Sequence, residues 1–214
     1  MANIKKLCLI AMIAMTVVSF GNLFGFSIAG ISVIICIVFF FIISSLGKKY
    51  SDDTGLNTKE IGTSLKDKKI YLWIVLPLIL NVVCIVLAKL FLPEYIEHLS
   101  GRTGFVVSLD KIVFLAFQLA ILALGEEIAW RAFFQKQLGK ALPIIPTLIV
   151  TSIIFAFGHS VLGSNVIVAY DIFFIFINSI IYGVIFYKTN NAWISAISHF
   201  IANLFTIIGI SFLL

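Results

Sequence analysis

The chain has 214 residues, of which 61% are hydrophobic and only 12% are charged, and its formal net charge is +5 at pH 7. Soluble domains average about 45–50% apolar and about 25% charged residues, so this composition excludes a soluble globular protein and indicates an integral membrane protein. We expect no nucleic-acid partner despite the positive net charge, because the lysines of residues 47–69 are interspersed with Asp and Glu residues and form no basic patch.

Apolar runs long enough to cross a bilayer recur along the whole chain. A membrane-spanning helix needs about 17–25 predominantly apolar residues. Runs of this kind lie at residues 7–22, 27–46, 70–92, 112–134, 143–159, 165–187 and 192–214. We therefore expect an all-α membrane protein with about seven transmembrane helices, in a range of about six to eight, that forms a single polytopic domain over residues 1–214.

Basic residues concentrate in every second loop between the predicted spans. They precede the first span, supply six lysines to residues 47–69, and follow the fourth and sixth spans, whereas Arg102 and Lys111 are the basic residues of the remaining loops. The positive-inside rule then predicts a cytoplasmic N-terminus and a C-terminus outside the cell membrane. The first apolar run continues past Phe24, so we expect an uncleaved helix rather than a signal peptide.

Several polar residues within the other spans have structural interpretations. Asn81 and Asn178 are expected to form hydrogen bonds between helices. Asp171 lies early in the sixth span, where a position at the membrane interface is expected rather than a catalytic one. The three cysteines all fall inside apolar runs, so we expect small buried side chains and neither a disulfide nor a metal site.

Two adjacent carboxylates, Glu126 and Glu127, interrupt the fourth span. A charge near the middle of a membrane costs at least ~2.5–3.5 kcal/mol, so such residues indicate a functional site with a partner. Neighbouring helical residues point about 100° apart, so the two side chains cannot face one cavity equally. Arg131 follows Glu127 by four residues and can pair with it, which leaves Glu126 free to act as a general base on a water molecule.

Two further motifs each add a histidine to this E-E-x-x-x-R pattern. The first is F-x-x-x-H, which ends at His159, and the second is H-x-x-x-N, formed by His199 and Asn203. His159 can orient a water or share its proton, and His199 with Asn203 can donate hydrogen bonds to an oxyanion. We therefore expect a buried polar site between the fourth, fifth and seventh spans. No Ser or Cys nucleophile with an adjacent base is evident.

The three motifs, in this order on separate spans, resemble the CAAX-protease and bacteriocin-processing family of intramembrane glutamic endopeptidases, also called CPBP or Abi. The resemblance covers about residues 120–207 and includes a Tyr182–Thr189 run that leads into Trp193. Trp130 stands where the family often has Phe, and Ala132 stands where Gly is common. The resemblance implies a catalytic core over about residues 112–214, with the N-terminal helices in residues 1–111.

The motifs and the resemblance together imply an enzyme. We expect an endopeptidase in which Glu126, His159, His199 and Asn203 are catalytic and Glu127 and Arg131 support them. Its partners would be a peptide or membrane-protein substrate and the lipid bilayer. The resemblance offers prenylated C-terminal peptides or bacterial leader, pheromone and bacteriocin peptides as substrates, and the composition favours the bacterial branch.

Three alternatives remain open on the sequence. A zinc-dependent protease could use Glu and two His as ligands, but H-E-x-x-H is missing and Asn203 is a poor ligand, so we expect no metal cofactor. A non-catalytic peptide-binding or bacteriocin-immunity protein could use the same scaffold. A transporter would usually show internal repeats, and none is visible. The oligomeric state is not encoded in any pattern that we recognise.

The predicted depths of the site residues conflict. Counting from the span ends places Glu126 ~8 Å and His199 ~10 Å from the inner edge of a ~30 Å hydrocarbon core, whereas His159 comes out ~24 Å from that edge. Helix tilt, or a dip of residues 136–146 into the membrane, is therefore needed for the three side chains to meet.

Overall fold

The computed structural model describes residues 2–21, 31–47, 54–103, 112–160 and 163–211. Over these residues all regular structure is helical and no strand occurs, which confirms the all-α prediction. The first half contains α1 (Ala2–Gly21), α2 (Ile31–Gly47), the short helices η2 (Thr58–Glu60) and α3 (Ile61–Ser64), α4 (Lys68–Phe91) and α5 (Glu94–Thr103). The second half contains α6 (Ile112–Glu127), η4 (Ile128–Gln135), α7 (Lys136–Leu138), α8 (Ile144–Phe157), α9 (Asn165–Thr189) and α10 (Ala192–Ser211).

Among the described residues, four helical segments are long and apolar enough to cross a membrane, namely Lys68–Phe91, Val113–Leu138, Asn165–Thr189 and Ala192–Ile210. They coincide with four of the seven predicted spans. Within the described residues the other three runs contain shorter apolar helices, Lys6–Gly21, Val33–Ser45 and Ile144–Phe157. The last of these begins after Pro143 and ends at Gly158; its 14 residues cover only ~21 Å, less than a ~30 Å hydrocarbon core.

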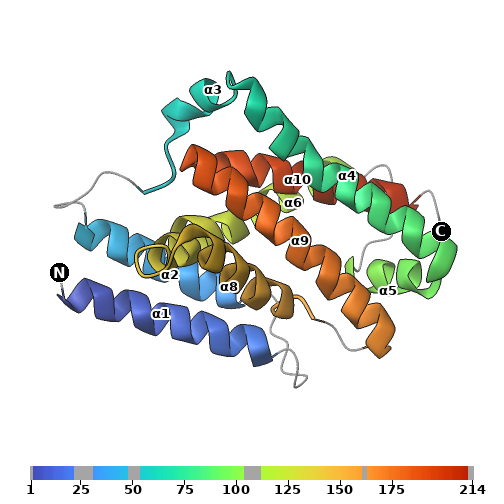
Figure 1. The fold of residues 1–214 in the computed structure, drawn as a ribbon, viewed down its shortest axis with the longest axis horizontal. Coiled ribbons are helices and arrows are strands. Elements are labelled where there is room, and N and C mark those ends of the chain that lie inside the picture. The colour runs from blue at the N-terminus through green and yellow to red at the C-terminus, as the bar shows by residue number, and fades with distance from the viewer. Residues whose placement is uncertain (1, 22–30, 48–53, 104–111, 161–162, 212–214) are drawn as a thin grey trace.

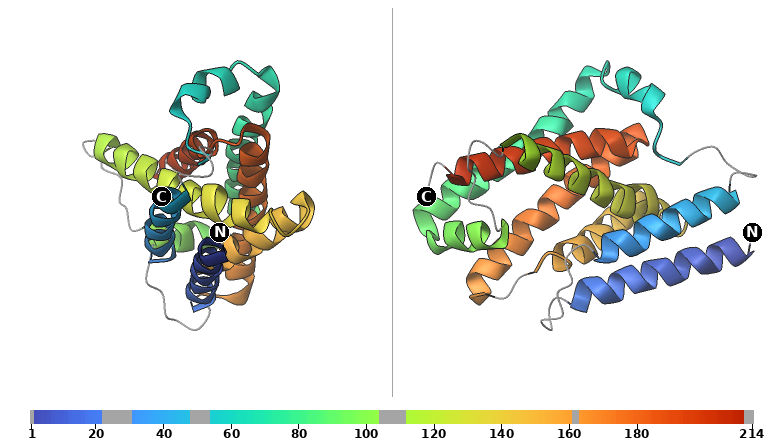
Figure 2. Two further views of the ribbon diagram at one scale, coloured as in Figure 1. Left: turned by 90° about the vertical axis from the view of Figure 1, so that its left-hand side faces the viewer. Right: turned by 180° about the vertical axis from the view of Figure 1, so that it is seen from behind.

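The helices form two packed groups that share one central element (Figures 1 and 2). α1 and α2 lie side by side and α1 packs on α8, whereas α10 packs against α4, α6 and α9, and α8 also packs against α9. The central element is η4, a π-helical continuation of α6 in which all eight side chains are buried. η4 contacts α2, α8, α9 and α10, so it lies between the two groups.

The connection from α9 to α10 shows how local chemistry sets the topology. Asn190 ends α9 in the left-handed conformation, with φ of 47°, which asparagine tolerates better than most residues. The side chain of Asn191 accepts a hydrogen bond from the Trp193 amide at 3.1 Å and so begins α10. This two-residue turn makes α9 and α10 neighbours with opposite directions.

The same turn is joined to a segment from the first half of the chain. The carboxamide of Asn191, which is fully buried, donates to the Asn57 carbonyl at 2.7 Å. The amide of Ala192 donates to the Gly55 carbonyl at 2.8 Å. Gly55 has φ of +73°, and a Cβ there would lie 3.1 Å from the ring of Phe186. Residues 54–57 therefore close the end of the bundle at which α9 meets α10.

Candidate active site

The π-helical geometry begins directly after the two adjacent carboxylates. The sequence predicts an uninterrupted α-helix across residues 112–134, but residues 128–135 are π-helical. π-helical segments widen the turn and occur frequently at functional sites. One contact that stabilises the wider turn is made by Gln135, which is buried and donates to the Gly183 carbonyl of α9 at 2.9 Å. A Cβ at Gly183 would lie only 2.6 Å from Leu148, so glycine allows this close approach.

Glu126 faces both motif histidines. Its Oε2 lies 3.7 Å from His159 Nε2 and 3.8 Å from His199 Nε2. The side chains of Glu126 and His159 are 21% and 29% exposed, whereas that of His199 is 7% exposed. The cluster is therefore accessible from the side of Glu126 and His159, and His199 forms its inner wall.

His159 lies in the turn that follows α8 rather than within the helix itself. Its Nδ1 is 2.8 Å from the Phe155 carbonyl, and the two rings are 4.3 Å apart between centroids. A carbonyl oxygen can only accept a hydrogen bond, so this contact assigns the proton to Nδ1 and directs Nε2 at Glu126. The F-x-x-x-H motif thus supplies both the histidine and the carbonyl that orients it.

Glu127 connects the second histidine to the predicted arginine. Its Oε1 lies 3.0 Å from His199 Nδ1, and its Oε2 lies 3.3 Å from Arg131 Nε. Glu127 and Arg131 are both fully buried, and Arg131 also donates to the carbonyl and hydroxyl of Ser179 at 3.2 Å each. The predicted pairing of Glu127 with Arg131 is therefore present. The same carboxylate also holds His199, a contact that the sequence did not indicate.

Aromatic rings complete the walls of the cluster. Tyr182 stacks on His199, with centroids 4.5 Å apart and an angle of 19° between the planes. The guanidinium carbon of Arg131 lies 5.0 Å from the Phe155 ring centroid and 5.9 Å from that of Tyr182. Ser179 was missed by sequence reasoning. It precedes Tyr182 by three residues, so a shared face of α9 was the available signal.

Asn203 lies apart from these contacts. It is one helical turn beyond His199 on α10 and lines a cavity together with Asn81 and Asn178. Among the described residues no hydrogen bond joins Asn203 to the carboxylate cluster. Five of the six predicted site residues therefore meet directly, and the sixth lies on the adjoining wall.

The predicted roles of three other polar residues can be compared with the structure. Asn178 donates to Asn81 at 2.6 Å, and Asn81 donates to Thr206 at 2.8 Å, which confirms hydrogen bonding between α4, α9 and α10. Asp171 is only 2% exposed and accepts a hydrogen bond from the Tyr95 hydroxyl at 2.8 Å. α5 folds over this carboxylate, so Asp171 is buried by the protein, and its expected position at the membrane interface stays a prediction.

The three motif residues meet although their predicted membrane depths differ. His159 and His199 both reach Glu126 although the residue counts place His159 much farther from the inner edge. The counts assume parallel helices perpendicular to the membrane, whereas α8 and α9 cross their neighbours at clear angles (Figures 1 and 2).

The residue types of the cluster raise the question of whether it can bind a metal ion. A carboxylate and two imidazoles are ligand types that zinc accepts. Within the described part of the chain, no group of three or more His, Cys, Asp and Glu side chains has the arrangement of a metal site. Glu126, His159 and His199 are the residues that would have to hold such an ion.

The comparison with protein families agrees with the motifs. Residues 108–205 match the family model described as type II CAAX prenyl endopeptidase Rce1-like. This segment of the chain is Rce1-like. It includes all three motifs and confirms the resemblance identified in the sequence, so it supports a membrane protease of the CAAX endopeptidase type. No curated protein and no solved structure matches the chain.

Removing either partner of the buried ion pair should destabilise the protein. Glu127→Ala or Arg131→Ala leaves an unpaired charge in a fully buried position, which costs about 3–5 kcal/mol. Thermal and denaturant unfolding in detergent micelles will measure the loss. Glu60→Ala is the control, because Glu60 is exposed and makes no side-chain capping bond. Wild-type stability in either buried variant would contradict the importance of this pair.

Proposed function

We propose that the protein is an intramembrane endopeptidase that hydrolyses a peptide bond in a membrane-associated peptide or protein. In this proposal Glu126 activates the attacking water. The observation that supports it best is the convergence of two imidazole nitrogens on one carboxylate, at 3.7 and 3.8 Å, inside a strongly apolar protein. The Rce1-like match over residues 108–205 supports the same class of reaction.

The exposed side of the cluster, formed by Glu126 and His159, activates the water and transfers the protons in this mechanism. A water bound between Glu126 and His159 loses a proton to the carboxylate as it attacks the carbonyl carbon of the scissile bond. The C–N bond of the tetrahedral intermediate then breaks, and the proton passes to the leaving amine. His159 Nε2 can share that proton, because its Nδ1 is already committed to Phe155.

The inner side of the cluster stabilises the negative charge. Glu127 accepts the hydrogen bond of His199 Nδ1, so Nε2 of the same ring is the nitrogen that faces the reacting groups. When the ring carries both protons, Nε2 can donate to the oxyanion, and stacking on Tyr182 restricts its orientation. Asn203, one turn farther along α10, is the proposed second donor.

The composition of the chain favours one class of substrate. We propose the bacteriocin-processing, or CPBP, branch of the CAAX-type proteases, because the chain is compact and rich in Ile, Phe and Lys. The substrate would be a bacterial leader, pheromone or bacteriocin peptide cut near the cytoplasmic face. The lipid bilayer is the second partner.

Glu126→Gln should abolish cleavage without preventing insertion into the membrane, since the amide has the shape of the carboxylate but cannot act as the base. Purified protein in proteoliposomes should be assayed with fluorogenic peptide libraries, alongside Glu97→Gln as a control on the exposed face of α5. We expect smaller but large losses for His159→Ala and His199→Ala. Asn203→Ala should lose about 10²–10³ in rate if it donates to the oxyanion. Near-normal turnover in Glu126→Gln would refute the assignment.

The reaction should proceed without a metal ion. Glu126 cannot serve both as a zinc ligand and as the general base, and Glu127 is committed to Arg131 and His199. Elemental analysis of active protein should therefore give far less than one equivalent of zinc, and activity should survive prolonged chelation. A stoichiometric metal whose removal stops cleavage and whose return restores it would make Glu126, His159 and His199 ligands.

We also propose seven spans with the N-terminus in the cytoplasm and the C-terminus outside. The three shorter apolar helices then cross the membrane together with the four longer ones. Single cysteines introduced in a cysteine-free background at Lys66 and Lys140 should be protected in intact cells from a membrane-impermeant thiol reagent. A cysteine at Arg102 should react with the reagent. Protection of position 102 would contradict the proposed orientation.

A further inference from the structure

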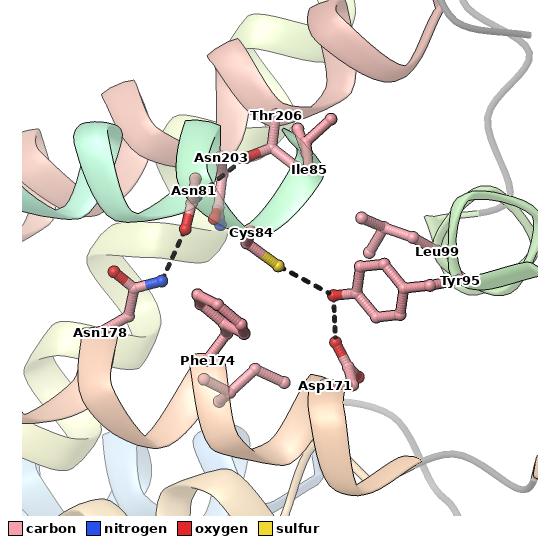
Figure 3. A pocket seen from close by; sticks show the side chains of 11 residues that line it. Asn81, Cys84, Ile85, Tyr95, Leu99, Asp171, Phe174, Asn178, Asn203 and Thr206 are labelled. Carbon is pink, nitrogen blue, oxygen red and sulfur yellow. Dashed lines mark hydrogen bonds between the residues drawn. The ribbon is translucent and has the colours of Figure 1, made fainter. Parts of the chain in front are cut away.

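A cavity of about 80 Å³ adjoins the candidate active site between α4, α5, α9 and α10 (Figure 3). Asn203 lines one side of it, and its carboxamide points into the cavity. Cys84 of α4 lies beside Asn203 in this view, and Tyr95 of α5 and Asp171 of α9 lie across the cavity. The cavity therefore includes a residue, Asn203, that lies one helical turn from His199 on α10.

The lining is unusually polar for the interior of a protein that is 61% hydrophobic. Part of this polarity has a structural explanation, because Asn178, Asn81 and Thr206 form a hydrogen-bonded chain between three helices. Their mutual orientation is fixed. Asn81 also donates to the Ala202 carbonyl at 3.3 Å, which cannot act as a donor, so the oxygen of Asn81 must face Asn178.

Asn203 is not explained in this way. Among the described residues no side chain or carbonyl forms a hydrogen bond with its carboxamide, which has two donor hydrogens and an acceptor oxygen. The side chain is partly exposed, so its amide hydrogens and its oxygen are available to a ligand that both donates and accepts hydrogen bonds.

We propose that this cavity is a water site that supplies the water consumed in hydrolysis, an inference that rests on the proposed function. One water molecule occupies about 30 Å³ in the liquid and needs two to four polar partners, so about 80 Å³ accommodates two or three waters. Carboxamides, a hydroxyl and a carboxylate around the cavity provide those partners.

The position of the cavity explains why the enzyme would use it. The substrate must approach Glu126 and His159 from their exposed side, and a bound peptide then covers that side. The next water has to reach the cluster from elsewhere, and Asn203 lies one helical turn from His199 on α10. Water held at Asn203 can replace the consumed molecule and also hold the Asn203 amide in place.

The native cysteines provide a direct test of hydration. Cys84 lines the cavity, whereas Cys36 is buried elsewhere and donates to the Ala129 carbonyl at 3.3 Å. Both side chains are almost fully buried, with exposures of 5% and 0%. A protein with Cys8→Ala and Cys36→Ala retains only Cys84, and one with Cys8→Ala and Cys84→Ala retains only Cys36.

Each protein is transferred to deuterated buffer, and the S–H stretching band is followed by infrared spectroscopy. We expect the Cys84 thiol to exchange at least about tenfold faster than the Cys36 thiol, because exchange of a buried group without local water requires opening of the structure. Equal exchange rates would overturn the water site. This measurement needs no peptide cleavage, so it remains decisive if the proposed protease activity is wrong.

The supply role is tested by filling the cavity. Cys84→Leu adds bulk within it without removing the carboxamide chain, and Val83→Leu adds bulk at the neighbouring position, which is 43% exposed on the outer face of α4. We expect Cys84→Leu to lower kcat about tenfold with little change in KM, equivalent to ~1.4 kcal/mol in the barrier. Val83→Leu should cleave at the wild-type rate.

A second filling variant, Ile175→Phe, approaches the cavity from α9 and decides the matter if Cys84→Leu does not fold. Wild-type kcat in a folded filling variant would overturn the supply role even if the Cys84 thiol exchanges rapidly. Absence of cleavage by the wild-type protein would instead overturn the proposed function, and with it the supply role.

Discussion

The arrangement of this protein depends on two opposite charges that solvent does not reach. Glu127 and Arg131 are fully buried, and removing both from water is costly unless every polar contact is used. The carboxylate is shared between Arg131 and His199, and the guanidinium also reaches Ser179 on α9 and lies over aromatic rings. One ion pair thereby fixes the relative positions of η4, α9 and α10, which carry the walls of the candidate site.

The division of labour between adjacent carboxylates follows from this constraint. Because Glu127 is held by both Arg131 and His199, its carboxylate cannot rotate to replace that of Glu126. Among the described residues, the polar contacts of Glu126 are the two imidazoles, at distances longer than ordinary hydrogen bonds. A water beside these groups can form hydrogen bonds with both the carboxylate and an imidazole, whereas the network behind it is closely packed. A rigid support behind a looser reactive face is what a preorganised site requires.

The sequence predicted the helical class, the residues of the polar cluster and the Glu127–Arg131 pair, because each depends on local spacing or on the cost of charge in an apolar run. The contact of Glu127 with His199 could not be predicted, since it joins residues 72 positions apart and depends on how α10 packs. The π-helical turn at Ile128 has no simple sequence signature. The hydrogen bond from Tyr95 to Asp171 could not be predicted either, because Tyr95 lies on α5, a helix whose position is set only by the folded bundle.

The hydrogen bond from Asn191 to the Asn57 carbonyl has a consequence for biosynthesis. Its partners are separated by 134 positions in the chain. Residues 54–57 leave the ribosome early, but the donors of Asn191 and Ala192 emerge only with the last hairpin. The early segment must therefore wait, with its carbonyls hydrated, until nearly the whole protein has been synthesised. The hairpin of α9 and α10 then forms the hydrogen bonds that hold residues 54–57 in place. The Rce1-like segment thus completes a fold that the N-terminal half begins.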